Sequence, residues 1–386
     1  MSEAYLILEN GTVFKGRPFG YEAETIGELI FTTGMTGYME ALTDPRYFGQ
    51  IVLQTFPLIG NYGVIPAEQR SSDIHLKAYI VREWCQEPSN FRSEGSLDNF
   101  LRINRVPGIF DIDTRAVTRI LRENGTMNAM ISNRSTLSDE QWEKLREYKI
   151  TGAIGACSEK ATGSAAGRHA GAVAAVTQGD ATQGTQGDGF LVSQHKRTVP
   201  LCQTVPPCPS IAVWDFGDTG RLIRSLGDAG CELSIFGHGI PPDRLLAENP
   251  DGIVLSGGPG DPAENTRIIE EIYKLCGSGI PIFGVGLGHQ MLALARGAKT
   301  EKLKFGHHGS NQTVAEPVTR KVFVTSQNHG YAVMPDSIPD GAVMSYANAN
   351  DGTCEGIDYT DIPAMSVQFE PTDNIIAKFL ASITQG

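Results

Sequence analysis

The segment "PIFGVGLGHQMLALA", residues 281–295, decides how the C-terminal half of the chain folds. It reads as a short apolar strand, a turn rich in glycine and then an apolar helix. This is the layout of a nucleophile elbow, in which a sharp turn lifts one side chain above a sheet for attack on a substrate. The residue at the tip of such a turn is expected to be Cys or Ser, but here it is Gly286, which has no side chain.

Two other interpretations of this turn stay open at the level of the sequence. A tight strand-to-helix turn without any chemistry has the same pattern. Gly284, Gly286 and Gly288 also alternate, as glycines do in dinucleotide-binding turns. That fingerprint, however, has the spacing G-x-G-x-x-G and opens the first βα unit of its domain. The run at Gly286 comes late in its half of the chain and has another spacing, so we do not expect a dinucleotide site.

The chain around this turn alternates between strands and helices from Ile211 onward. Short apolar runs end in glycine, and helical stretches lie between them, at 221–229, 263–276 and 288–296. This alternation predicts a mostly parallel sheet covered by helices. Ligands of such sheets bind at the carboxyl ends of the strands. We therefore expect "SGGPGDP" at 256–262 and "GVGLG" at 284–288 to border one shared pocket.

The N-terminal part of the chain has the pattern of a β-rich α/β domain. "YLILENGTVFKG" places Asn10-Gly11, a strong hairpin signal, between two alternating apolar runs. "DIDTRAVTRILRENG" predicts a helix, because Asp113 or Thr114 can cap its start and Gly125 can end it. Its apolar residues recur at helical spacing and form one face.

The stretch 158–208 differs from both parts in composition. It is small, polar and rich in glycine, and its last residues are rich in proline. Such a composition lacks the apolar residues of a core, so we interpret the stretch as a linker or a mobile surface segment. The expected organisation is an N-terminal domain over 1–150, a linker over 151–210 and a C-terminal domain over 211–386.

The bulk composition is that of an ordinary globular protein, with 386 residues, 40% of them hydrophobic and 20% charged. The formal net charge of -12 argues against nucleic acid or an anionic membrane as the main partner. Neither a spanning apolar run nor a signal peptide is evident, so we expect a cytoplasmic protein. The seven cysteines contain no C-x-x-C pair, which argues against a disulfide framework or a structural zinc site.

"KFGHHGSNQ" places His307 and His308 side by side. Adjacent residues on a strand face opposite ways, so two such histidines rarely share a metal ion. Neither a cysteine nor a carboxylate stands at ligand spacing nearby. We therefore expect a surface loop here, and we expect no metal ion or cofactor in the protein.

Several ordered motifs together resemble the small, glutamine-hydrolysing subunit of carbamoyl-phosphate synthase. "TTGMTGYMEALTDPRYFGQIV" and "FPLIGNYG" are similar to the N-terminal domain of this family. "NPDGIVLSGGPGDP", "GVGLGHQMLALARGAKTEKLKFGHHGSN", "TSQNHGYAV" and "SVQFEP" are similar to its class I glutamine amidotransferase domain. The resemblance covers nearly the whole chain except the low-complexity stretch.

The resemblance implies a function in nitrogen metabolism. The family releases ammonia from glutamine and passes it through a tunnel to a large ATP-using subunit. That partner makes carbamoyl phosphate from ammonia and bicarbonate, for arginine or pyrimidine biosynthesis. Glutamine hydrolysis in the family depends on a Cys–His–Glu triad, with Cys at the tip of "G-I-C-L-G-H-Q" and the other two residues in a late "Q-x-H-P-E".

This sequence departs from the family at all three triad positions. By resemblance, Gly286 stands at the Cys position, Glu370 at the His position and Thr372 at the Glu position. An ionised glutamate only accepts hydrogen bonds and does not exchange a proton near pH 7 as histidine does. We therefore expect the glutaminase activity to be lost. The backbone N–H groups of Gly258 and Leu287 could still stabilise an oxyanion.

The residues around the substrate match the family better. By resemblance, glutamine or another small amino acid would be held around Gly258, Gly260, Leu287, Gln290, Asn328, Gly330 and Tyr331. Arg46 stands where the family commonly has a small serine that faces the glutamine. An arginine there would block the pocket, grip a carboxylate with its guanidinium group, or point to solvent.

The sequence thus favours a carbamoyl-phosphate synthase small subunit that has lost its glutaminase activity and still docks on the large subunit. One alternative is a stand-alone pseudoenzyme that binds an amino acid or has a regulatory role. The other is a divergent hydrolase in which Glu370 activates a water molecule.

Overall fold

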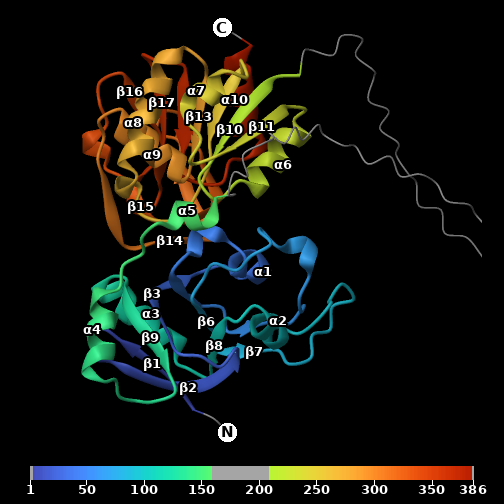
Figure 1. The fold of residues 1–386 in the computed structure, drawn as a ribbon, viewed down its shortest axis with the longest axis vertical. Coiled ribbons are helices and arrows are strands. Elements are labelled where there is room, and N and C mark those ends of the chain that lie inside the picture. Colours follow the sequence, from blue (N-terminus) through green and yellow to red (C-terminus); the bar gives the residue numbers. More distant parts are fainter. Residues whose placement is uncertain (1–2, 159–207, 385–386) are drawn as a thin grey trace, which may run out of the picture.

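The computed structural model describes residues 3–158 and 208–384 of the chain. Two parts lie one above the other, the N-terminal part below and the C-terminal part above in the view of Figure 1. The low-complexity stretch lies almost entirely outside the described residues. The prediction that it is a linker therefore concerns residues that the structure does not describe. No helix of the described ranges is both long and apolar enough to cross a membrane.

The N-terminal part is built on a closed barrel with the strand order β1-β2-β8-β6-β4-β3-β9. Its strands are β1 (Ala4–Leu8), β2 (Val13–Gly20), β3 (Thr25–Thr32), β4 (Gln50–Gln54), β6 (Ala78–Ile80), β8 (Pro107–Phe110) and β9 (Met127–Ser132). A small separate sheet pairs β5 (Leu58–Ile59) with β7 (Glu83–Trp84). The helices of this part are α1 (Tyr38–Leu42), α2 (Leu97–Ile103), α3 (Thr114–Asn124), α4 (Asp139–Glu147) and α5 (Ala153–Cys157).

Two local predictions for this part are confirmed. Strands β1 and β2 pair antiparallel around the Asn10-Gly11 turn, where Gly11 has a φ of 88° that favours glycine. In α3 the Asp113 side chain accepts a hydrogen bond from the Ala116 N–H, and Gly125 follows the last turn. The predicted apolar face of α3 packs into the barrel core.

The C-terminal part contains a nine-stranded sheet with the order β11-β10-β12-β13-β18-β17-β15-β14-β16. The first five strands in this order are parallel, namely β11 (Glu232–Gly237), β10 (Ser210–Asp215), β12 (Gly252–Leu255), β13 (Ile282–Val285) and β18 (Ala364–Val367). The sheet continues with an antiparallel extension of β14 (Thr300–Ala315), β15 (Val322–Val333), β16 (Ala342–Asn348) and β17 (Cys354–Tyr359). The predicted parallel sheet is confirmed, and the extension is an addition to it.

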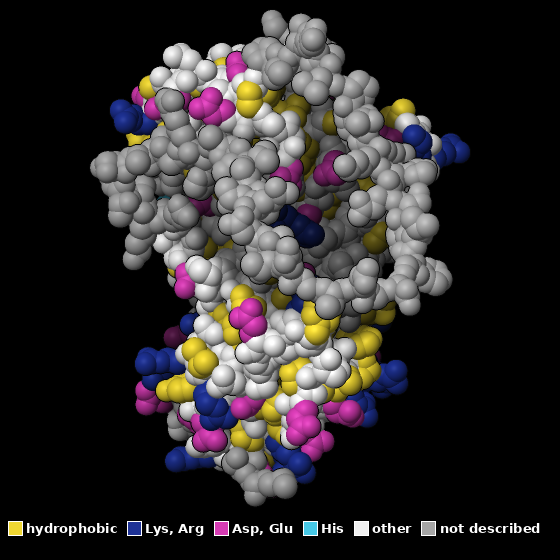
Figure 2. Space-filling view, turned by 90° about the vertical axis from the view of Figure 1, so that its right-hand side faces the viewer, with side chains coloured by type: hydrophobic (Ala, Val, Ile, Leu, Met, Phe, Trp, Pro, Cys, Tyr) yellow, Lys and Arg dark blue, Asp and Glu magenta, His cyan; other side chains and the backbone are white. Residues whose placement is uncertain are grey.

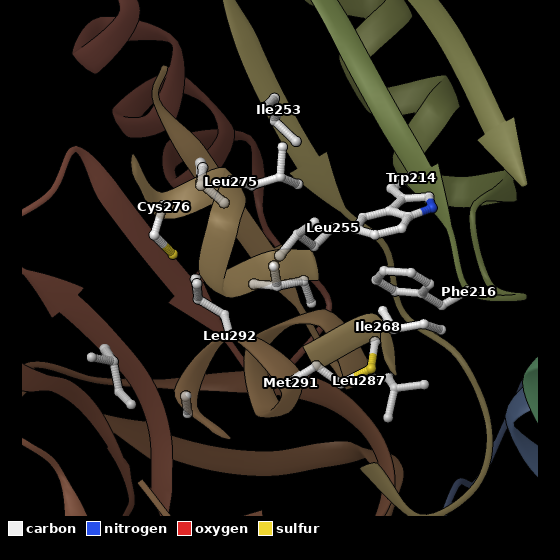
Figure 3. Packing of buried hydrophobic residues seen from close by; sticks show 14 of the residues in the cluster. Trp214, Phe216, Ile253, Leu255, Ile268, Leu275, Cys276, Leu287, Met291 and Leu292 are labelled. Atoms are coloured by element: carbon white, nitrogen blue, oxygen red, sulfur yellow. The ribbon is translucent and has the colours of Figure 1, made fainter. Parts of the chain in front are cut away.

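Helices cover both faces of the parallel strands, as the alternating pattern predicts. They are α6 (Gly220–Asp228), α7 (Pro242–Leu246), α8 (Thr266–Leu275), α9 (Leu287–Ala295) and α10 (Asp373–Ile383). On one face, Met291 and Leu292 of α9 pack near Trp214 and Leu255 of the sheet, as Figure 3 shows. On the other face, Phe379 of α10 stacks on Phe283 of β13 with ring centroids 5.2 Å apart. These two cores hold the ends of β12 and β13 in place.

The two parts of the chain contact each other through α5 and β14 (Figure 1). Ile154 of α5 is buried in the core of the C-terminal part, so the segment predicted as a linker from residue 151 begins with a packed helix. Backbone N–H groups of Thr33 and Thr126 donate to carbonyl groups of β14, at 3.0 and 2.7 Å. These contacts create a junction next to the strand ends.

Candidate functional site

The turn at Gly286 has the backbone conformation expected of a nucleophile elbow. A single residue, Gly286, joins β13 to α9, with φ 55° and ψ -111°. Residues other than glycine rarely adopt a φ in this region, and nucleophile elbows are known for this strained turn. A Cβ atom added to Gly286 would lie 3.5 Å from the Cα atom of Gly257, which is an ordinary contact. The turn therefore has the shape of an elbow and space for a side chain, but no side chain.

A cavity of about 940 Å³ opens at the junction of the two parts, beside this turn. Every residue predicted for the site lines it, namely Arg46, Gly258, Gly260, Gly286, Leu287, Gln290, Asn328, Gly330, Tyr331, Glu370 and Thr372. Figure 2 shows basic and acidic side chains gathered in a hollow of the molecular surface. The fold thus brings together residues that lie up to about 330 positions apart in the sequence.

Arg46 points into the cavity and not to solvent, so the third sequence interpretation of this residue is wrong. It lies in a short 3₁₀ turn, Pro45–Tyr47, and its side chain is only 10% exposed. Its Nη2 atom is 2.7 Å from Asp44 Oδ2 and 2.9 Å from Glu370 Oε1. The guanidinium group therefore lines the cavity and grips carboxylates, and these carboxylates belong to the protein itself.

Arg70 and Asp218 are site residues that the sequence analysis missed. Arg70 binds Asp218 in a bidentate pair, with Nε–Oδ1 and Nη2–Oδ2 distances of 3.0 and 2.9 Å. Its Nη1 atom also donates to Glu370, and Arg221 donates to the other oxygen of the same carboxylate. A signal existed for Asp218, because it closely follows β10 at the predicted ligand-binding edge. Arg70 lies outside the helices and strands of the barrel, and no pattern singled it out.

These charged groups form a balanced cluster of three arginines and three carboxylates, called the ion-pair cluster below. Its members are Asp44, Arg46, Arg70, Asp218, Arg221 and Glu370. Burial raises the pKa of Glu370, but the charges of the three arginines outweigh burial and lower this pKa to about 2. Burial likewise raises the pKa of Asp44, and its two neighbouring arginines bring it well below the usual range. Such carboxylates stay ionised near pH 7 and are weak bases.

Two amide side chains predicted to hold the substrate are bonded to protein groups. The Asn328 Nδ2 atom donates to Asp44 Oδ2 at 2.9 Å, and its Oδ1 atom lies 2.7 Å from His308 Nδ1. The Gln290 Nε2 atom donates to the Tyr331 carbonyl oxygen at 2.6 Å and to Gln368 at 2.8 Å. A ligand that used these amides would have to compete with the bonds already present.

The structure offers no obvious replacement for a nucleophile among the described cysteines. None of the six lines the cavity. Cys157 contacts the junction through the Pro45 carbonyl oxygen, and burial together with nearby aspartates raises the pKa of its thiol to about 12. Such a thiol is inert near pH 7, because the thiolate is the nucleophile. Thr372 precedes α10 as an exposed residue, and its side chain makes no capping hydrogen bond.

The prediction of a surface loop at His307 and His308 is wrong. Both residues lie in β14 and are buried. As expected for neighbours on a strand, they face opposite ways. His308 faces Asn328 and the ring of Tyr47, whereas the His307 Nε2 atom lies 2.8 Å from Asp351. The sequence concealed the burial, because β14 pairs with both β15 and β16 and no local pattern shows these contacts.

Comparisons with known proteins agree with this architecture. The family model described as "Carbamoyl-phosphate synthase small chain, CPSase domain" matches residues 6–131. The model described as "Glutamine amidotransferase class-I" matches residues 212–373.

Curated relatives match over almost the full length of the chain. The carbamoyl phosphate synthase small chain of Syntrophotalea carbinolica is 42% identical over 369 residues, which are 96% of this chain and 92% of that protein. The one from Clostridium perfringens is 40% identical over 369 residues, covering 96% of this chain and 94% of the relative. The one from Vibrio vulnificus is 41% identical and covers 95% and 92%. The chain therefore belongs to the family of carbamoyl-phosphate synthase small chains, with a class I glutamine amidotransferase domain in its C-terminal part.

Proposed function

We propose that this small chain has lost glutamine hydrolysis and serves the large, ATP-using subunit as a docked, non-hydrolysing partner. In this proposal the triad positions of the family are occupied by Gly286, Glu370 and Thr372. The synthase is cytoplasmic, uses free ammonia, and supplies carbamoyl phosphate to arginine or pyrimidine biosynthesis. Residues 1–150 and 211–386 act as its two domains, with 151–210 between them.

The observation that carries this proposal is the ion-pair cluster beside an elbow without a side chain. Amide hydrolysis through a covalent intermediate needs a nucleophile, a base within hydrogen-bond reach and a group that orients the base. Gly286 has no atom that can attack, and both oxygens of Glu370 accept hydrogen bonds from arginines. The chemistry of a glutaminase therefore has neither its first nor its second component here.

The same contacts argue against the divergent hydrolase. A general base works best when its pKa is close to the operating pH. The pKa of Glu370 is lowered to about 2, so this carboxylate would take a proton from water only very weakly. None of the described contacts of Glu370 favours a hydrolase over a non-hydrolysing small chain that docks on the large subunit.

The deciding experiment compares two nitrogen sources. The purified chain is combined with the large subunit from its own source, and carbamoyl phosphate is measured with glutamine or with ammonium chloride. We expect synthesis from ammonium and none from glutamine. The small chain of a relative with an intact "G-I-C-L-G-H-Q" motif, paired with its own large subunit, is the positive control for glutamine.

Each other outcome selects a different function. Synthesis from glutamine at a turnover near the usual enzyme range of about 1 per second or above would refute the loss of glutaminase activity. Failure to form a complex with the large subunit, together with calorimetric binding of glutamine or another small amino acid, would favour the stand-alone binding protein.

A further inference from the structure

Three polar side chains from three strands of the antiparallel extension meet away from the ion-pair cluster. They are His307 of β14, His329 of β15 and Glu355 of β17. One ligand-type atom from each lies within 4.8 Å of the other two. The side chains are 8%, 5% and 0% exposed, respectively. The strand register explains the meeting, because His307 and His329 are direct partners in the β14–β15 pair.

Hydrogen bonds on the outer side of each imidazole orient its inner nitrogen toward the centre of this group. His307 Nε2 lies 2.8 Å from Asp351 Oδ2, and His307 Nδ1 lies 3.3 Å from Glu355 Oε1. His329 Nδ1 donates to the Tyr331 carbonyl oxygen at 2.8 Å, since a carbonyl oxygen only accepts. Histidines that bind metal ions almost always donate their other N–H to a carboxylate or a backbone carbonyl in this way.

The inner atoms of His329, Gln327 and Glu355 are acceptors that face one another. A neutral imidazole that donates from Nδ1 has only a lone pair at Nε2. The His329 Nε2 lone pair faces Gln327 Oε1 at 3.2 Å and Glu355 Oε1 at 3.8 Å. The orientation of the Gln327 amide is set by its Nε2 atom, which donates to Thr325 Oγ1 at 3.1 Å. Converging acceptors of this kind repel one another unless a cation lies between them.

A second observation concerns the carboxylate of this group. The Glu355 Oε2 atom is buried and has no hydrogen-bond partner among the described residues. The other oxygen, Oε1, accepts from Asn348 Nδ2 at 3.4 Å and from Thr353 Oγ1 at 3.5 Å. Half of the carboxylate is therefore buried without a partner, which is costly unless it pairs or coordinates a metal ion. Asn348 Nδ2 also lies 3.3 Å from His307 Nδ1. Burial lowers the pKa of His307, but its contacts with Asp351 and Glu355 outweigh burial and raise this pKa to about 9, so a metal ion has to replace the proton on Nδ1.

We propose that His307, His329 and Glu355 bind a zinc ion, with Gln327 Oε1 as the fourth ligand. Zinc usually takes four ligands in a tetrahedron, and histidine nitrogens and carboxylate oxygens at about 2.0–2.2 Å are among its usual ligands. Such distances place the ligand atoms roughly 3.3 Å from one another. The observed separations of 3.3 and 3.8 Å from Glu355 Oε1 are close to that geometry. The widest separation within the group, up to 4.8 Å, closes by a small movement of the side chains.

The site would be structural, because its ligands come from the protein and tie three strands together. His329 also lines the cavity, which gives the ion a route to the site. The next residues of β15 carry Gly330 and Tyr331, which line the same cavity. The zinc ion therefore holds the strand that forms one wall of the cavity, and this role does not depend on the loss of glutamine hydrolysis.

The test is direct binding of zinc by the full-length chain after removal of metal with a chelator. Calorimetry should show one ion per chain, and cobalt(II) should give the visible absorption of a four-coordinate nitrogen and oxygen site. Glu355→Gln should weaken binding by more than about 100-fold, and Asp351→Asn by roughly 10–100-fold as an outer hydrogen-bond partner. His308→Gln is the matched control, because His308 is the neighbouring histidine on the opposite face and should leave the affinity unchanged.

The melting temperature with and without zinc provides a second test that does not depend on calorimetry of poorly folded variants. Zinc should raise the melting temperature of the parent chain and leave that of His307→Gln unchanged. The proposal is overturned if the parent binds no stoichiometric ion, or if all variants bind zinc as the parent does. It is also overturned if NMR of the metal-free and zinc-treated chain shows the same doubly protonated His329, because a proton would then close the network.

Discussion

At Gly286 the backbone angles of a nucleophile elbow occur without a nucleophile, and the neighbouring Glu370 is held by three arginines. These two residues bear on two separate requirements of glutamine hydrolysis, the nucleophile and the base. In the proposed function, the glycine lacks the reacting atom, whereas the glutamate stands in place of the base and carries a fixed negative charge. The consequences of each can be measured separately.

For Gly286→Cys we expect no measurable ammonia release from glutamine, because Glu370 stands where the family has the imidazole that activates the thiol. The positive φ should cost about 1–2 kcal/mol of stability for any residue with a Cβ atom. Gly286→Ala is the control, since it has the same backbone cost without the thiol. Thermal melts and an ammonia assay check both statements, and glutamine turnover by the Cys variant would show that another group acts as base.

For Glu370→Ala we expect a loss of roughly 3 kcal/mol of stability, because the buried guanidinium groups of Arg46 and Arg70 lose one carboxylate and keep only Asp44 and Asp218. Arg221→Ala removes a partner of the same carboxylate, but the Arg221 side chain is 65% exposed. An exposed partner of this kind should contribute only about 0–1 kcal/mol. Urea unfolding of both variants compares the two values, and equal losses would mean that the cluster is screened by solvent throughout.

At the scale of elements, three turns deliver the cavity residues. The β13–α9 turn supplies Gly286, the 3₁₀ turn before β4 supplies Arg46, and the segment between β18 and α10 supplies Glu370. The first of these belongs to the parallel sheet, and its shape follows from the glycine. The second comes from the barrel, so the content of the cavity depends on how the two parts meet.

We expect the triple variant Gly286→Cys, Glu370→His, Thr372→Glu to regain little glutaminase activity. Arg46 and Arg70 would then face the new imidazole without Glu370, and their charges would lower its pKa and oppose its protonation. Adding Arg46→Ser should raise ammonia release by roughly 100-fold, within the usual contribution of a general base. Adding Arg46→Lys keeps the charge and is the matched control. A triple variant as active as the quadruple one would show that Arg46 is no obstacle.

At the scale of the whole molecule, the ion-pair cluster joins the two parts of the chain. Asp44, Arg46 and Arg70 come from the N-terminal part, and the other three members come from the C-terminal part. The backbone hydrogen bonds between β14 and the barrel reinforce the same junction. The cavity is therefore also the place where the relative position of the two parts is set.

This junction should weaken in acid. The folded-state pKa of Glu370, about 2, is below the ordinary value of 4.5, so its contribution is complete above pH 4.5 and is lost as the pH falls toward 2. Each unit of that shift corresponds to about 1.4 kcal/mol, so the contribution is at most a few kcal/mol. Melts of the parent and of Glu370→Gln between pH 7 and 2 should converge at the acid end. A constant difference across this range would mean that the charge of Glu370 does not stabilise the fold.

The amino-acid sequence alone predicted the features that local patterns encode. The glycine-terminated apolar runs predicted the parallel strands, Asp113 and Gly125 marked the ends of α3, and the missing side chain at Gly286 was visible from the letters alone. Capping, periodicity and turn preference act within a few residues, so they can be read without the fold.

Which charged and acceptor groups contact one another depends on the folded chain. Arg70 and Asp218 are 148 positions apart, and Arg46 and Glu370 are 324 positions apart. The burial of His307 likewise depends on β15 and β17, and Glu355 reaches it from a strand that no local pattern links to it. Such contacts arise because folding brings distant segments together, and the pKa of Glu370 and the convergence of acceptors around Glu355 are consequences of that proximity alone.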